Sequence, residues 1–123
     1  MNPVALKDMS LDQLLKRFVD LALDQDRALL AGDITSLNEL GEALHVMSIE
    51  MKSREGDQRR ALLRLYDHPN IEVRLMAAKS TLAVAPEMAR RVIQAIAESG
   101  EYPQAAYARM ALRSLDHGTL KLT

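Results

Sequence analysis

The sequence contains no cysteine and no tryptophan, and Phe18 is its single phenylalanine. Without cysteine there are no disulfides, no thiolate zinc sites and no cysteine nucleophiles. Aromatic residues make up only 3% of the chain, whereas hydrophobic residues make up 48%, so the core has to be built from Leu, Ala, Val, Ile and Met. A chain of 123 residues has single-domain length and is long enough to bury such a core.

Long apolar stretches are also missing. No run approaches the roughly 18 apolar residues of a membrane span, and the segment from Met1 to Leu11 has no apolar region of the kind found in a secretory signal. We therefore expect a cytoplasmic protein that does not enter a membrane.

Motifs for catalysis and metal binding are absent as well. His45, His68 and His117 are far apart and none has metal-ligand spacing, and no glycine-rich loop follows a strand pattern. The spacing of Asp and Glu marks no pair as an acid–base couple. We interpret His68, in a turn, as a backbone or carboxylate partner rather than a general base. We expect no catalytic residue, no metal and no cofactor, and predict that the chain is not an enzyme.

The sequence does contain apolar spacing typical of helices, broken by cap and turn residues. Ser10 and Gln13 form a capping box, and Gly32 and Asp33 end one helix and start the next. Gly41, inside the second helix, predicts the close approach of a neighbour. The expected helices cover about 11–31, 34–52, 58–66, 71–84, 86–98 and 103–117.

These helices predict an all-α fold, a short right-handed α-solenoid of about six helices in three antiparallel pairs. We expect a single domain over residues 1–123, with an N-terminal helical hairpin in 1–52, two helix pairs in 57–118 and a tail in 119–123. A weak internal repeat supports this architecture. A shift of 33 residues places Ala78 on Ala111 and Leu82 on Leu115, and a period in the thirties is typical of α-solenoids.

The turn and helix at the centre of the chain carry a family resemblance. The stretch His68-Pro69-Asn70-Ile71-Glu72-Val73-Arg74-Leu75-Met76-Ala77-Ala78, ending at Leu82, resembles a HEAT repeat in its proline turn, Val-Arg pair, paired alanines and leucine. The whole chain is also similar to the small bacterial HEAT-like domain of unknown function DUF2019, through Phe18-Val19, Gln25, Asn38 and the Leu65-Tyr66-Asp67-His68-Pro69-Asn70 segment. The resemblance implies an armadillo-type helical fold and leaves function open.

Charge is unevenly distributed along the chain. The formal net charge is −1, yet residues 1–52 hold 5 basic and 9 acidic residues, whereas residues 53–123 hold 11 basic and 8 acidic ones. The basic half is rich in arginine: Arg54, Arg59, Arg60, Arg64, Arg90, Arg91, Arg109 and Arg113. Such a distribution is typical of solvated helical faces and is also compatible with a binding surface.

Stacked helix pairs offer an extended concave surface. The first functional hypothesis is therefore a non-catalytic protein-interaction module, including a neutralising (immunity-type) or accessory protein, with another protein as its partner. The alternative is a nucleic-acid-binding protein that uses the Arg-rich C-terminal half, although near-zero net charge and few aromatic residues count against it. The sequence leaves the oligomeric state open. The candidate partner-binding surface comprises Arg74, Lys79, Tyr107, Arg109 and Arg113.

Arg74 has two interpretations. In the HEAT pattern it reaches back to the preceding turn, where Asp67 is the nearest carboxylate in the sequence. Its role is then structural. Alternatively, it joins Lys79, Tyr107 and Arg109 in one strip of a concave ligand-binding face.

Overall fold

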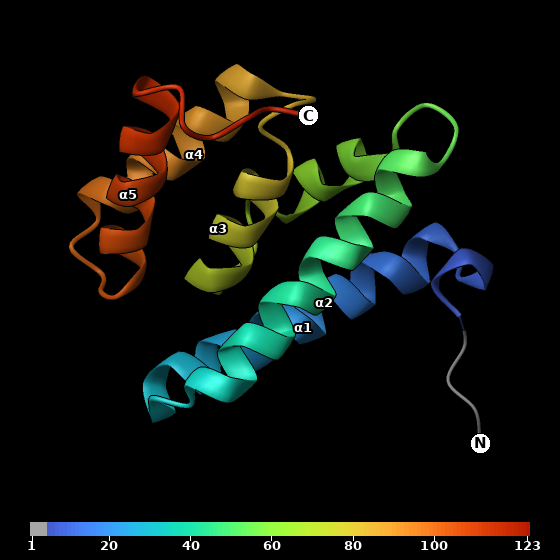
Figure 1. Ribbon diagram of the computed structural model, residues 1–123, viewed down its shortest axis with the longest axis horizontal. Coiled ribbons are helices and arrows are strands. Elements are labelled where there is room, and N and C mark those ends of the chain that lie inside the picture. The colour runs from blue at the N-terminus through green and yellow to red at the C-terminus, as the bar shows by residue number, and fades with distance from the viewer. Residues whose placement is uncertain (1–4) are drawn as a thin grey trace. The chain divides into compact units, whose positions relative to one another are not determined.

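The computed structural model describes residues 5–123, and that part of the chain is helical with no strand (Figure 1). Its α-helices are α1 (Leu11–Ala31), α2 (Ile34–Ser53), α3 (Ile71–Ser80), α4 (Pro86–Glu98) and α5 (Gln104–Asp116). Two 3₁₀-helices, η1 (Leu6–Asp8) and η2 (Gln58–Leu65), complete it. The all-α prediction is confirmed.

The helix starts follow from local hydrogen bonds. The Ser10 side chain accepts from the Gln13 amide at 3.1 Å, and the Gln13 side chain accepts from the Ser10 amide at 2.8 Å. Asp33 caps α2 by accepting from the amide three residues later, and Asn70 caps α3 by accepting from the amides two and three residues later. Gly32 has the left-handed φ of +68° expected after the end of α1. The predicted capping signals are therefore confirmed.

The chain divides into two compact units, one ending at Ala61 and the other covering Leu62–Thr123. In the first unit α1 and η1 both pack against α2. Arg54 joins η1 to the end of α2, because its Nη2 atom donates to the carbonyls of Leu6 at 2.9 Å and Met9 at 2.8 Å, while its Nε atom donates to Glu50. The division falls inside η2, within the segment 57–118 in which the sequence predicted two helix pairs.

Gly41 of α2 lies beside Gln25 of α1. A Cβ atom at position 41 would stand 3.8 Å from Gln25 Nε2, which is an ordinary van der Waals distance. The two helices do approach each other here, but the distance leaves room for a Cβ atom, so glycine is not needed for the approach. The Oε1 atom of Gln25 is buried and has no hydrogen-bond partner among residues 5–123.

In the second unit α4 packs against both α3 and α5, and α3 also contacts α5. The core is aliphatic, as predicted, and its small alanines allow the helix backbones to approach closely. The buried cluster consists of Leu75, Ala78, Leu82, Ala89, Ile93, Ile96, Ala97, Ala108, Ala111 and Leu112. All of these residues belong to the second unit, so its core is formed within residues 62–123.

Two predicted helices differ from the structure. The segment expected at 58–66 is a 3₁₀-helix, in which Leu62 and Leu65 still share one side because the period is three residues. Helix α3 ends at Ser80 instead of about Val84. Pro86 disfavours helical geometry at the residue before it, and Ala85 accordingly has φ −145°, so the chain turns before α4 begins.

Candidate functional site

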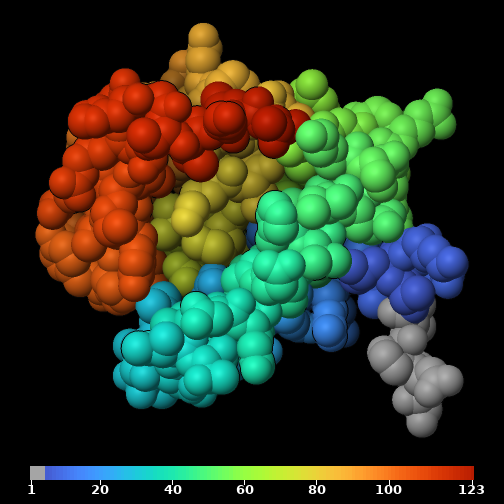
Figure 2. Space-filling model, in the orientation of Figure 1, coloured from blue at the N-terminus to red at the C-terminus, as the bar shows by residue number. Residues whose placement is uncertain are grey.

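Helix α5 brings two of the five candidate residues together. Arg109 and Arg113 are four residues apart, which places them on one side of an α-helix. Tyr107 lies about 200° around α5 from Arg109, at about 100° per residue, and therefore belongs to another side. Figure 2 shows α5, coloured orange to red, at the surface of the second unit.

Arg109 is held by contacts within the chain. Its Nε atom donates to the Ala97 carbonyl at 3.1 Å, and its Nη1 atom donates to the Tyr102 hydroxyl at 2.7 Å. The guanidinium carbon also lies 5.5 Å from the centre of the Tyr102 ring, a cation–π distance. Ala97 is in the last turn of α4, where carbonyls lack a partner within the helix. Arg109 thus ties α5 to the end of α4 and fixes its own side chain.

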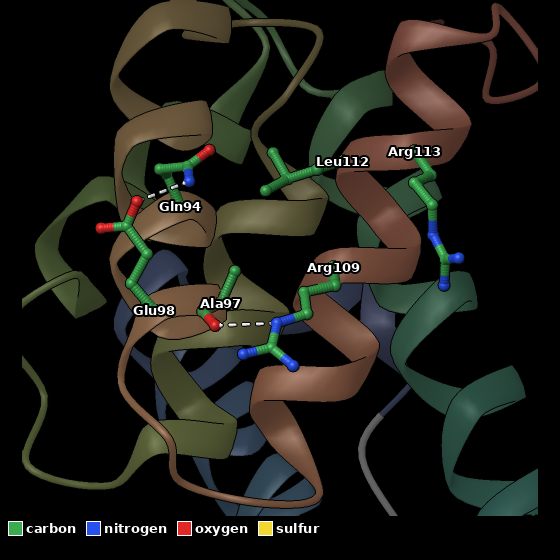
Figure 3. A pocket seen from close by; sticks show the side chains of 6 residues that line it. All are labelled: Gln94, Ala97, Glu98, Arg109, Leu112 and Arg113. Atoms are coloured by element: carbon green, nitrogen blue, oxygen red, sulfur yellow. Dashed lines mark hydrogen bonds between the residues drawn. The ribbon is translucent and has the colours of Figure 1, made fainter.

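Arg113 is exposed, and its side chain makes no hydrogen bond or ion pair with the part of the chain that the structure describes. It lines an open hollow of about 490 Å³ between α4 and α5, together with Gln94, Ala97, Glu98, Arg109 and Leu112. We call this hollow the α4–α5 groove (Figure 3). Arg113 is therefore a charged group of the groove that is available to a ligand.

The two rims of the α4–α5 groove differ in charge. On α4, Gln94 Nε2 donates to Glu98 Oε1 at 2.8 Å, which orients the carboxylate. Arg113 lies across the groove on α5, and Figure 3 shows Glu98 and Arg113 on opposite sides of it. Leu112 and Ala97 also line the groove, although both are almost fully buried. Beyond the groove, Arg90 of α4 and Asp116 of α5 form an ion pair at 2.8 Å.

Arg74 lies elsewhere, at the start of α3. Its Nη1 atom donates to the carbonyls of His68 at 2.8 Å and Pro69 at 3.0 Å. Side chains of a helix point back toward its N-terminus, which brings the guanidinium over this turn. The expected contact with the turn is present, but carbonyl groups replace the Asp67 carboxylate, and no ion pair joins Arg74 to Asp67 within residues 5–123.

Arg74 also lines a smaller cavity of about 170 Å³ between α3 and α4, with Tyr66 and Ile96 among its neighbours. The Tyr66 hydroxyl is 2.5 Å from Thr81 Oγ1, and burial raises the pKa of Tyr66 although that hydrogen bond opposes the shift. Lys79 and Tyr107 are exposed and line neither cavity. The structure therefore groups Arg109 with Arg113 and does not place the other three candidates in the same groove.

The sequence reasoning missed Gln94, Glu98 and Tyr102. The first two stand four residues apart on α4, as Arg109 and Arg113 do on α5. Each pair therefore lies on one side of its own helix, but the spacing does not show that the two sides face each other. Tyr102 carried no comparable signal, because its contact with Arg109 depends on the path of the connection between α4 and α5.

Comparison with known proteins agrees with this fold. The chain matches the family described as "Domain of unknown function (DUF2019)" over residues 12–116. It belongs to the DUF2019 family. It is also similar to the crystal structure of the protein RPA1889 from Rhodopseudomonas palustris CGA009, with 44% identity, a TM-score of 0.92, and coverage of 98% of this chain and 100% of that one. No curated protein matches the chain.

Several other arginines of this DUF2019 chain also have partners within it. Arg59 is buried and donates to both oxygens of the Asp57 carboxylate, from Nε at 2.9 Å and from Nη2 at 2.7 Å. The hydrogen bond from Arg59 lowers the pKa of Asp57 below its ordinary value of 3.8, and Asp57 in turn raises the pKa of Arg59. Arg54, Arg90 and Arg109 are likewise engaged.

Neither a metal centre nor a membrane span is found in the DUF2019 chain over the residues described. Within 5–123, no three His, Cys, Asp or Glu side chains gather where they could hold a metal ion. None of the helices there combines the length and the apolar character needed to cross a bilayer.

Proposed function

We propose that this DUF2019 chain is a non-catalytic protein-interaction module and that its α4–α5 groove receives the partner. The proposal includes a HEAT-like, armadillo-type α-solenoid as the scaffold, with helices stacked in antiparallel pairs. The contact of Arg74 with the turn before α3 supports it, since that contact suits the Val73-Arg74 pair of the HEAT pattern. A neutralising or accessory role in a bacterial cytoplasm fits this proposal.

The observation that carries the proposal is the contrast between Arg109 and Arg113. Both line the α4–α5 groove and both are exposed, but Arg109 is hydrogen-bonded to the chain itself, whereas the Arg113 side chain makes no such bond within residues 5–123. A fixed groove wall and an available guanidinium reduce the ordering that a ligand has to impose. Arginine also forms strong, directional hydrogen bonds with carboxylates. A partner with a carboxylate side chain therefore finds a prepared site.

Nucleic-acid binding by the Arg-rich half is the alternative, and the intrachain contacts count against it. Four of its proposed arginines, Arg54, Arg59, Arg90 and Arg109, bind carboxylates or carbonyls of the chain itself. Phosphate binding relies on cationic groups that are available to displace counterions. Glu98 at the rim of the groove adds a charge that repels phosphate.

Site-specific photocrosslinking in the native cell tests the proposal. A photoreactive amino acid replaces Gln94 at the rim of the groove. In a matched control it replaces Ala83, which is exposed and lines neither the α4–α5 groove nor the smaller cavity between α3 and α4. We expect a discrete protein adduct from position 94 and none from position 83. The same adducts from both positions, adducts that nuclease removes, or no adduct from position 94 would contradict the proposal.

A further inference from the structure

The α4–α5 groove has an acidic rim and a basic rim, and this asymmetry indicates more than a general affinity for acidic partners. Gln94 donates a hydrogen bond to one oxygen of the Glu98 carboxylate. The carboxylate has further acceptor positions for a ligand. Arg113 on the opposite rim offers donors. Leu112 and Ala97, both almost fully buried, line the groove together with these charged residues. A ligand that matches the groove carries opposite charges on its two sides.

The length of the groove limits the size of that ligand. The Arg90–Asp116 ion pair joins α4 to α5 near one end, and the Arg109–Ala97 hydrogen bond joins them near the other. Arg109 and Asp116 are seven residues apart, about 10 Å along a helix that rises 1.5 Å per residue. An extended peptide advances about 3.3 Å per residue, so about three of its residues fit between these two contacts.

We propose that the groove binds an extended peptide segment in which an acidic residue is next to a basic one. This inference rests on the proposed function and names the partner chemistry. Successive side chains of an extended chain point to opposite sides, so the acidic side chain meets Arg113 on α5 while its basic neighbour meets Glu98 on α4. A nucleic-acid strand carries only negative charge and matches one rim alone.

A displayed library of random heptapeptides, selected on the purified chain, tests this specificity. We expect the wild type to enrich adjacent acidic and basic residues. Arg113→Gln should lose the preference for the acidic residue and keep that for the basic one, and Glu98→Gln should do the reverse. Arg64→Gln, an exposed arginine outside the groove, is the matched control and should select the same peptides as the wild type.

The affinity of one enriched peptide shows how much Arg113 contributes to binding. Its dissociation constant, measured by fluorescence anisotropy, should rise about three- to tenfold for Arg113→Gln, as for the loss of a largely exposed charged hydrogen bond, and stay unchanged for Arg64→Gln. Selection of purely acidic peptides, selection without charge preference, or retention of no peptide would overturn the inference. If the adduct at position 94 forms in cells despite such a result, the proposed function stands and only the partner chemistry is wrong.

Discussion

Arginine side chains in this protein bind main-chain carbonyls as well as carboxylates. Arg54 reaches the carbonyls of Leu6 and Met9, Arg74 those at the turn before α3, and Arg109 that of Ala97. Carbonyls in turns and at helix ends lack the partners that a helix interior supplies, and a guanidinium with five donors satisfies them over a distance. The arginine content of residues 53–123 therefore serves the fold to a large extent.

Replacement of Arg74 by alanine should destabilise the chain. The substitution removes two hydrogen bonds from a charged donor and leaves the carbonyls of His68 and Pro69 without that partner. We expect a loss of about 1–3 kcal/mol in the free energy of unfolding, measured by urea denaturation. Lys79→Ala, an exposed position on the same helix, should change it by less than about 0.5 kcal/mol. Equal effects of the two variants would show that Arg74 does not hold the turn.

Asp57 and Arg59 should make stability depend on pH. Because the folded state lowers the pKa of Asp57 below 3.8, the pair stabilises the protein above that value, and this contribution disappears as the pH falls through the lower folded pKa. Asp57→Asn is the suitable variant, since Asn also tolerates the positive φ of 54° at this position.

We expect the free energy of unfolding of the wild type to exceed that of Asp57→Asn by about 1–3 kcal/mol at pH 7. This difference should shrink once the pH falls below about 4. Urea denaturation at a series of pH values measures it. A difference that is constant from pH 7 to pH 2 would mean that the carboxylate charge is not responsible.

Helix α3 is short but buried on several sides. Val73, Leu75, Ala77 and Ala78 are all fully buried, and they cover more than one face of its ten residues. A helix of this length is marginal by itself in water, so tertiary packing has to maintain it. In the sequence, Ile71, Leu75 and Ala78 form one apolar stripe and Val73 and Ala77 form a second, a pattern typical of a helix with neighbours on two sides.

Leu75→Ala should therefore be costly. The side chain is fully buried in the core cluster of the second unit, and its truncation leaves a cavity that the neighbouring helices fill only in part. We expect a loss of about 2–5 kcal/mol in the free energy of unfolding, seen as a lower midpoint of chemical denaturation. A loss below about 0.5 kcal/mol would mean that α3 is not central to its unit.

Local signals predicted the elements better than the groove. Ser10 and Asp33 cap helices through bonds to residues three positions away, so the sequence alone indicated those helix starts. The partners of Arg109 lie seven and twelve residues away, and the α4–α5 groove depends on which sides of two helices face each other. Packing decides that orientation, and the sequence could not show that only Arg109 and Arg113 of the five candidate residues line this groove.

The division into two compact units has a consequence for folding. The core cluster lies entirely within residues 62–123, so we expect a fragment of these residues to fold alone, with limited stability because small domains bury a smaller share of their surface. Circular dichroism should show a helical spectrum and a cooperative thermal transition. A spectrum of disordered chain at low temperature would show that this core depends on residues before Leu62.

A comparison of Arg109→Gln with Arg113→Gln tests most directly whether the α4–α5 groove receives the partner. Two quantities are measured for each variant, the melting temperature and the yield of the photocrosslinked adduct at position 94. Arg109→Gln should lower the melting temperature by several degrees, as expected for a loss of about 1 kcal/mol, because it removes the bonds to Ala97 and Tyr102. Arg113→Gln should leave the melting temperature nearly unchanged and abolish most of the adduct. An undiminished adduct in Arg113→Gln would contradict the claim that this groove receives the partner.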